Sequence, residues 1–256
     1  MSTETVLTSA DSPGGAGPLE GRTVVVIGRG SGIARATALA ARDAGARVVA
    51  AGRHPEALGE AYADEPGIRT ELVDVTDDAS IAALGDHLGS AGGVDHVVST
   101  ASSRARGLLG ELSRDAVRAS LDTKVVGPLM LAKHLGPRIR PGGSFVLFSG
   151  VAAFKIAVGT LAVAVTNGAA DTLTRSLALE LAPVRVNAIS PGVIDTGAWD
   201  ALGEERKTAM YADMSRRNPA RRIGTAEDVA SAVLFALTNT FLTGATIPVD
   251  GGEELT

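Results

Sequence analysis

The chain has 256 residues, with Lys+Arg 24 against Asp+Glu 29 and a net charge of −5 at pH 7. A hydrophobic share of 45% and a charged share of 21% are typical of a folded globular protein. The negative balance gives no general attraction to nucleic acid or anionic lipid, and the sequence has no apolar run long enough to span a membrane. The absence of cysteine excludes disulfides and a cysteine nucleophile, and it fits a cytoplasmic environment.

The first twenty residues are small, polar and rich in Gly and Pro, which predicts a flexible tail over residues 1–20. We expect no secretory signal, because Glu4 is acidic and no positively charged region precedes an apolar stretch. Residues 21–256 show no second linker and no internal repeat. They are therefore expected to form one domain, with a lid segment at about 197–219.

From residue 23 onward, short β-branched runs alternate with Ala- and Leu-rich stretches. The predicted strands are Thr23–Ile27, Arg47–Ala51, Arg69–Val73, His96–Ser99, Ser144–Phe148, Val184–Ile189 and Ala245–Val249. The predicted helices are Gly32–Ala44, Pro55–Tyr62, Asp77–Leu88, Ser113–Leu135, Leu161–Leu181 and Thr225–Leu237. Nearly continuous apolar strands separated by helices predict a Rossmann-type, doubly wound parallel α/β sheet with helices on both faces. Ligands of such folds bind beyond the carboxyl ends of the strands.

A glycine-rich turn follows the first predicted strand and leads into a helix. Its residues are Gly28, Arg29, Gly30, Ser31, Gly32 and Ile33. Glycines let backbone N–H groups approach a pyrophosphate, and a helix N-terminus favours an anion. The turn therefore indicates a dinucleotide site, although a tight turn without a ligand remains open on this evidence alone.

Arg53 follows the second predicted strand, about 20 residues after the turn, where dinucleotide folds place the residue that binds the ribose. Gly52 supplies no carboxylate for the 2′-hydroxyl of NAD, whereas the Arg53 guanidinium suits a 2′-phosphate. Arg29 adds a second positive charge, so we predict NADP(H) as cofactor. The alternative is that both arginines are merely solvated.

These features, taken together, resemble the short-chain dehydrogenase/reductase family over residues 20–253. The resemblance is carried by the glycine turn, by Asp74-Val75, by the segment from Pro191 to Thr196 and by the carboxyl-terminal Val249-Asp250-Gly251-Gly252. It implies cofactor contacts from positions that follow three of the predicted strands. These positions are Asp74, Val75, Thr100, Ala101, Pro191, Gly192, Ile194 and Thr196.

The family's catalytic positions carry other residues here. The tyrosine position falls on Val163, the lysine on Asn167, and the serine on Gly150, next to Ser149. The structural asparagine of the preceding helix falls on Lys124. No register slip restores the tyrosine, because the chain has no Tyr between Tyr62 and Tyr211.

Three residues are candidate substitutes for the missing catalytic groups. Lys124 could serve as a proton donor if it is partly desolvated, or it could be a structural tie to Asn167 or to a backbone carbonyl. Asn167 could keep a ribose contact as a neutral donor. Ser149 could orient a substrate oxygen, or it could be a strand-end hydroxyl bonded to the backbone.

The substrate side is predicted to include Lys155, Thr160, Val163 and Tyr211, with a solvated Lys155 as the alternative for that residue. The four histidines have no metal-ligand spacing, so no metal site is expected. The helices Ser113–Leu135 and Leu161–Leu181 resemble the family's helical interface, which implies a homotetramer or a homodimer.

The leading functional prediction is an NADP(H)-dependent oxidoreductase that acts on a small organic, secondary-metabolite-like substrate. Without the tyrosine acid, this substrate is expected to be an activated C=O, C=N or C=C compound, because general acid catalysis contributes about 10²–10⁴ in rate. Two alternatives remain open. One is a non-redox enzyme (cyclase, lyase or isomerase) on the same fold, and the other is an NADP(H)-binding pseudoenzyme that acts as a sensor.

Overall fold

The structure, a computed structural model, describes residues 17–197 and 199–256. Its main sheet is entirely parallel and has the order β3-β2-β1-β4-β5-β6-β9. The strands are β1 (Thr23–Ile27), β2 (Arg47–Gly52), β3 (Ile68–Leu72), β4 (Val94–Ser99), β5 (Ile139–Phe148), β6 (Arg185–Pro191) and β9 (Thr246–Val249). This arrangement confirms the predicted seven-stranded, doubly wound α/β sheet.

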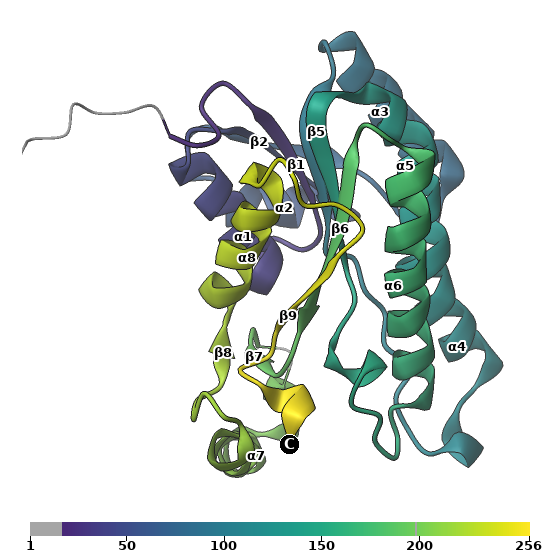
Figure 1. Cartoon of the computed structure of the whole chain (residues 1–256), viewed down its shortest axis with the longest axis vertical. Coiled ribbons are helices and arrows are strands. Elements are labelled where there is room, and N and C mark those ends of the chain that lie inside the picture. Colours follow the sequence, from purple (N-terminus) through teal and green to yellow (C-terminus); the bar gives the residue numbers. More distant parts are fainter. Residues whose placement is uncertain (1–16, 198) are drawn as a thin grey trace, which may run out of the picture.

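Helices cover both faces of the sheet. They are α1 (Gly32–Asp43), α2 (Pro55–Ala61), α3 (Asp78–Ser90), α4 (Arg114–Leu121), α5 (Gly127–Leu135), α6 (Leu161–Glu180), α7 (Glu204–Arg217) and α8 (Ala226–Thr238). Figure 1 shows α1, α2 and α8 on one face, and α3, α5 and α6 on the other. Each strand is therefore covered on both sides, as its continuous apolar sequence requires.

The core consists of two apolar layers, one on each face of the sheet. On the α3–α5–α6 side, Phe145 and Leu147 of β5 pack with Leu131 of α5. On the α1–α8 side, small side chains such as Ala38 of α1 let that helix approach Val233 of α8 closely. Both layers exclude water along the length of β1 and β4, so these two strands hold their carboxyl ends in fixed positions.

The strand order reverses between β1 and β4. The chain first moves outward through β2 and β3 and then returns to the other side of β1 at β4. The connections on either side of this point leave in opposite directions, which opens a crevice beyond the carboxyl ends of β1 and β4. Residues that follow these two strands are therefore the first candidates for a site.

Three features differ from the sequence-based expectation. Leu19 is 1% exposed and its N–H donates to Ala44 O, so residues 17–20 belong to the packed domain rather than to a tail. Residues 1–16 lie outside the described residues. The single helix expected over Ser113–Leu135 is interrupted by a π-helical turn, η2 (Asp122–Val126), between α4 and α5.

The third difference lies in the segment expected to form a lid. This segment contains the whole of α7, which was not predicted as a helix. It is flanked by a small parallel pair, β7 (Ile194–Asp195) with β8 (Gly224–Thr225). Figure 1 shows this region at the end of the molecule where the strands of the main sheet terminate. Its role as a lid remains a prediction.

Short 3₁₀ turns complete the chain. They are η1 (Leu109–Glu111), η3 (Gly136–Arg138), η4 (Val151–Ala153), η5 (Asp200–Leu202) and η6 (Glu253–Leu255). In the part of the chain that the structure describes, no helix is both long enough and apolar enough to cross a membrane.

Candidate active site

The glycine turn packs tightly against the end of β4. Thr100 Oγ1 donates to Ile27 O at 3.0 Å, and a Cβ atom at Gly28 would lie 2.2 Å from that hydroxyl oxygen. Gly32 has φ +54°, and a Cβ there would lie 3.0 Å from Thr196 Cβ. Gly28 is therefore required because the Thr100 side chain approaches it closely, and Gly32 is required because its backbone has a positive φ. Thr196, far along the sequence, is brought against the turn.

The N-terminus of α1 fits an anionic group. Its N-cap residue, Ser31, makes no side-chain cap, and its first turn contains no acidic residue. The helices α2, α5, α6 and α7 also lack a side-chain cap, whereas α3, α4 and α8 are capped by Asp77, Ser113 and Thr225. Uncapped N–H groups at a glycine turn suit a pyrophosphate, since the helix dipole favours negative charge there. These residues would hold the pyrophosphate of a dinucleotide.

Arg53 lies exposed at the end of β2, directly after Gly52. A Cβ at Gly52 would lie 2.5 Å from Gly28 O, so no larger residue fits there without displacing the glycine turn. Asp74 accepts from the N–H and the hydroxyl of Thr76 at 2.9 and 2.7 Å. Burial opposes ionisation of Asp74, but these two bonds and the charge of Arg53 outweigh it and lower its pKa. The carboxyl edge of the sheet thus presents one exposed cation, Arg53, and one carboxylate, Asp74, held by hydrogen bonds to Thr76.

The remaining predicted cofactor positions lie around the same carboxyl edge of the sheet, where they pack against the core or make backbone hydrogen bonds. Ile33, Val75 and Ala101 pack against the two core layers. Gly192, after Pro191 at the end of β6, donates its N–H to Val249 O at 3.1 Å. Ile194 is 6% exposed and lies on β7.

The polypeptide after β6 is anchored to the carboxyl terminus. Val193 N donates to Glu253 Oε2 at 3.1 Å, and a Cβ at Gly192 would lie 2.7 Å from the same oxygen. Burial raises the pKa of Glu253. The anchor fixes the path of the backbone from Pro191 to Thr196, where the resemblance implies contacts with the cofactor.

Lys124 occupies the π-helical turn between α4 and α5. A Cβ at Gly127 would lie 2.7 Å from Val75 O, so the glycine lets this turn approach the end of β3 closely. The Lys124 side chain is 8% exposed, and its Nζ donates to Ser149 O at 2.9 Å. Burial lowers the pKa of Lys124 to about 7, and the positive charge of Arg104 adds to the effect, while Asp171 opposes it. A buried amine with this pKa can exchange a proton near neutral pH.

Ser149 and Asn167 form a closed group with backbone carbonyls. Ser149 Oγ donates to Asn167 O at 3.2 Å, and Asn167 Nδ2 donates to Gly150 O at 3.1 Å. Asn167 Oδ1 is buried and has no hydrogen-bond partner among the described residues. Val163, one turn earlier on α6, is 6% exposed and has no proton to give. Within this group, Asn167 Oδ1 is therefore a buried acceptor that no described residue satisfies.

Three predicted substrate contacts make hydrogen bonds within the protein, and their role toward a substrate stays a prediction. Lys155 Nζ donates to Glu253 O at 3.0 Å, so it supports the carboxyl-terminal anchor. Thr160 Oγ1 donates to Ala157 O at 2.7 Å within its own loop. Tyr211 OH donates to Asp195 Oδ1 at 3.1 Å, and burial together with this carboxylate raises the pKa of Tyr211 to about 12. Tyr211 is therefore a poor proton donor.

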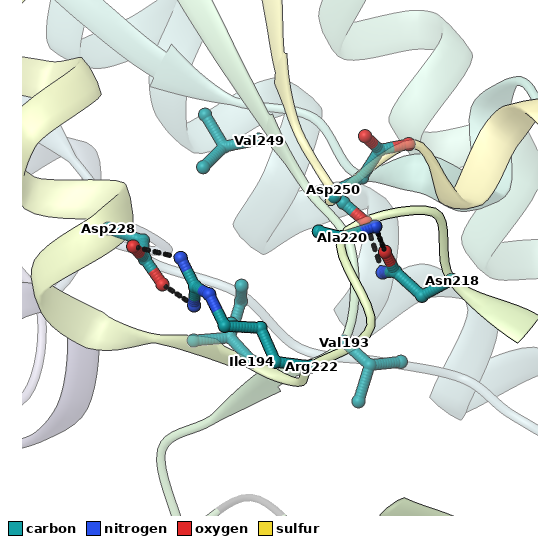
Figure 2. A pocket seen from close by; sticks show the side chains of 10 residues that line it. Val193, Ile194, Asn218, Ala220, Arg222, Asp228, Val249 and Asp250 are labelled. Carbon is teal, nitrogen blue, oxygen red and sulfur yellow. Dashed lines mark hydrogen bonds and ion pairs between the residues drawn. The ribbon is translucent and has the colours of Figure 1, made fainter. Parts of the chain in front are cut away.

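Two hollows near the carboxyl terminus lie apart from Lys124, Ser149 and Asn167. The first, of about 170 Å³, is the one in Figure 2, where the Arg222–Asp228 ion pair stands opposite Asn218, whose Nδ2 donates to Asp250 O at 2.8 Å. The second, of about 250 Å³, lies beside α7 and is partly lined by Lys155, Met210 and Met214. The polar groups of the first hollow are paired with one another, so they support the backbone around β7 and β8.

Sequence reasoning missed four residues of this region, which are Arg104, Arg106, Trp199 and Asp171. Arg104 and Arg106 lie on the loop after β4, and Arg106 Cζ stands 5.1 Å from the centre of the Trp199 ring. Asp171 on α6 is 6% exposed and accepts from Thr246 Oγ1 at 2.9 Å. For Arg104 and Arg106, the sequence did offer a signal: two arginines lie on a loop that follows a buried strand, and loops at strand ends often carry functional side chains.

Comparisons with known proteins agree with this geometry. A family model described as enoyl-(acyl carrier protein) reductase matches residues 27–254. Short-chain dehydrogenase/reductase ucsE from Acremonium sp. is 32% identical over 254 residues, which cover 92% of this chain and 96% of that protein. L-xylulose reductase from Homo sapiens is 34% identical over 243 residues, covering 91% and 97% of the two chains.

Solved structures give the same result. A small-chain dehydrogenase in complex with NADPH has 33% sequence identity and a TM-score of 0.79, over 92% of this chain and 99% of that chain. The MalC reductase/Diels-Alderase from Malbranchea aurantiaca has 26% identity and a TM-score of 0.86, over 94% and 99%. The chain belongs to the short-chain dehydrogenase/reductase family.

Proposed function

We propose that this protein is an NADP(H)-dependent oxidoreductase with a non-standard active site, in which Lys124 supplies the proton. The observation that carries the proposal is the buried Lys124 amine, which is bonded to Ser149 O at the end of β5 and has a pKa lowered to about 7 by burial. Val163 stands where the family resemblance expects a tyrosine, so a different acid is needed.

The cofactor preference rests on Arg53. Its guanidinium is exposed at the end of β2, and no ion pair engages it within residues 17–197 and 199–256. A 2′-phosphate there would gain a charge-assisted, bidentate contact. The related small-chain dehydrogenase solved with NADPH supports the same choice.

When bound, the nicotinamide supplies a hydride to an electron-poor carbon of the substrate. The protonated Lys124 amine has three N–H donors and uses one on Ser149 O. A second N–H can therefore reach the substrate atom that gains electron density and transfer its proton there, and the neutral amine then takes a proton from water. Val163 adds an apolar surface, and Ser149 holds the carbonyl that orients the amine.

We propose a small organic substrate with an activated C=O, C=N or C=C bond. Such acceptors need less acid assistance than a plain ketone, because negative charge on the product atom is already stabilised. One relative is named an L-xylulose reductase and another a reductase/Diels-Alderase, so the names of similar chains do not narrow the substrate further.

A non-redox activity is the second candidate. It is favoured by the Ser149–Asn167–Gly150 group, in which the donors are already satisfied by backbone carbonyls and do not point at a substrate oxygen. The similarity to a protein described as both reductase and Diels-Alderase gives this candidate a parallel on the same fold. A cofactor-binding sensor without turnover is the third outcome.

The deciding experiment follows NADPH absorbance with panels of simple ketones, imines, quinones and activated alkenes. Turnover confined to activated acceptors, and lost in Lys124→Met, supports the proposal. Brisk reduction of simple ketones that persists in Lys124→Met would show that another acid operates. Tight NADPH binding without turnover of any class would favour the non-redox or sensor function.

We also propose that the protein assembles into a homotetramer or homodimer and is cytoplasmic. Exposed apolar side chains on α5 and α6 support the assembly, among them Leu129 at 41% and Val165 at 56% exposure. Light scattering at micromolar concentration should give a mass of two or four chains, and Val165→Glu should lower it. A mass of one chain for the unmodified protein would contradict the assembly.

A further inference from the structure

The loop after β4 is held firmly at both sides of its two arginines. Ser120 Oγ on α4 donates to Ser103 O at 2.8 Å, and Gly107 N donates to Gly159 O at 3.1 Å. Between these anchors, Arg106 stacks over Trp199, a few residues after Thr196. The loop therefore contacts α4, which precedes the turn that carries Lys124, and the segment that leads into α7.

The charges on this loop are not compensated by the protein. Desolvation lowers the pKa of Arg104, and the positive charges of Arg106 and Arg29 lower it further. Lys124 is also close enough to be affected by Arg104. In the part of the chain that is described, no carboxylate pairs with Arg104 or Arg106.

Arg185 is a buried arginine elsewhere in the chain, and unlike the loop arginines it is hydrogen-bonded to backbone carbonyls. Its guanidinium donates to Ala236 O at 2.8 Å and Leu237 O at 2.7 Å. Arg104 makes no comparable bond to the described residues, and it faces the like charges of Arg106 and Arg29. Holding several cations together without partners is unfavourable unless an anion joins them.

We propose that Arg104 and Arg106 recognise an anionic group of the substrate, a carboxylate or a phosphate monoester. This inference rests on the proposed function, since it gives the substrate class of the same cleft. The pyrophosphate of a dinucleotide already has the uncapped N-terminus of α1, and its 2′-phosphate has Arg53. Arg106 stands beyond Thr196, beside Trp199, so it serves the substrate end of the cleft.

The test measures binding rather than turnover. Calorimetry on the full chain, with and without saturating NADPH, would compare aromatic and aliphatic monocarboxylates with their amides, and phosphate monoesters with their alcohols. Charge-assisted bonds predict that the anions bind about tenfold to a hundredfold more tightly than their neutral partners. Arg104→Gln with Arg106→Gln should bring this ratio close to one, while the exposed Arg114→Gln should leave it unchanged.

Two results would overturn the inference. One is the absence of any preference for anions over their neutral partners across the panel. The other is a double variant that keeps the preference but weakens NADPH binding by more than about tenfold, which would assign the cations to the cofactor's phosphates. If the protein binds no NADPH, the proposed function fails, and the titrations without cofactor still decide whether the anion site exists.

Discussion

The two sides of the cleft are built differently. On the cofactor side, the backbone does most of the work: Gly28 and Gly32 allow close approaches, and the N-terminus of α1 is left uncapped. On the side where we propose proton transfer, the proposed chemistry depends on single side chains, above all Lys124. If it does, replacements there should change the reaction while the fold and cofactor binding remain, so the two sides should respond to mutation independently.

The largest expected effect is on the proton-transfer side. Lys124→Met should lower kcat with an activated acceptor by about 10²–10⁴, because it removes the general acid. The NADPH dissociation constant, measured by calorimetry, should change by less than about threefold. Lys133→Met, an exposed lysine on α5, is the matched control and should keep full activity. Equal losses of NADPH affinity and kcat would mean that the two sides are not separable.

The complementary change affects the cofactor side alone. Arg53→Ala should weaken NADPH binding by about tenfold to a hundredfold, since a charge-assisted contact is worth about 1.5–3 kcal/mol. NADH affinity should be unchanged, and turnover at saturating NADPH should be nearly normal. Arg69→Ala, exposed on the neighbouring strand, controls for general loss of positive charge. Similar affinities of the unmodified protein for NADPH and NADH would remove the basis for the NADP assignment.

The buried amine should also make stability depend on pH. Burial lowers the pKa of Lys124 from 10.5 to about 7, so between these values the unfolded chain binds more protons than the folded one. Stability therefore rises with pH in this window, by up to about 1.4 kcal/mol per pH unit, and the contribution is flat below pH 7.

Urea unfolding at pH 7, 8 and 9, at one protein concentration, measures this slope. The difference in unfolding free energy between the unmodified protein and Lys124→Met should change across the series. Activity should fall as the pH rises through about 7, because the protonated amine is the acid. A difference that stays constant with pH would place the amine's pKa outside this range.

The smallest expected effect tests the Ser149–Asn167–Gly150 group. A Cβ at Gly150 would lie 2.8 Å from Asn167 Nδ2, so Gly150→Ser must displace that amide from its bond to Gly150 O. The loss should destabilise the protein by about 1 kcal/mol, as measured by denaturant unfolding. Gly59→Ser on α2, where a Cβ meets nothing within 4 Å, should change stability by about half as much or less. An unchanged free energy of unfolding in Gly150→Ser would show that the Asn167 amide can move aside without cost.

Local sequence patterns were sufficient for the fold and for the glycine turn after β1. The apolar run Thr23–Ile27 is long enough for one strand, and the glycines after it permit only a tight turn into a helix. The sequence also shows that no Tyr lies between Tyr62 and Tyr211, which is the basis for predicting an absent catalytic tyrosine. These features depend on residues that are neighbours in the chain, so composition and spacing carry the information.

Tertiary structure alone decided where the polar side chains point. Lys155 bonds to Glu253, 98 residues away, and Lys124 to Ser149, 25 residues away. Arg106 and Trp199 meet only because the loop after β4 and the segment after β7 leave the same edge of the folded domain. The sequence cannot show such pairings, because a lysine or arginine bonds to whichever acceptor the folded backbone brings within reach. The pKa of Lys124 is likewise set by burial, and this burial exists only once both core layers have formed.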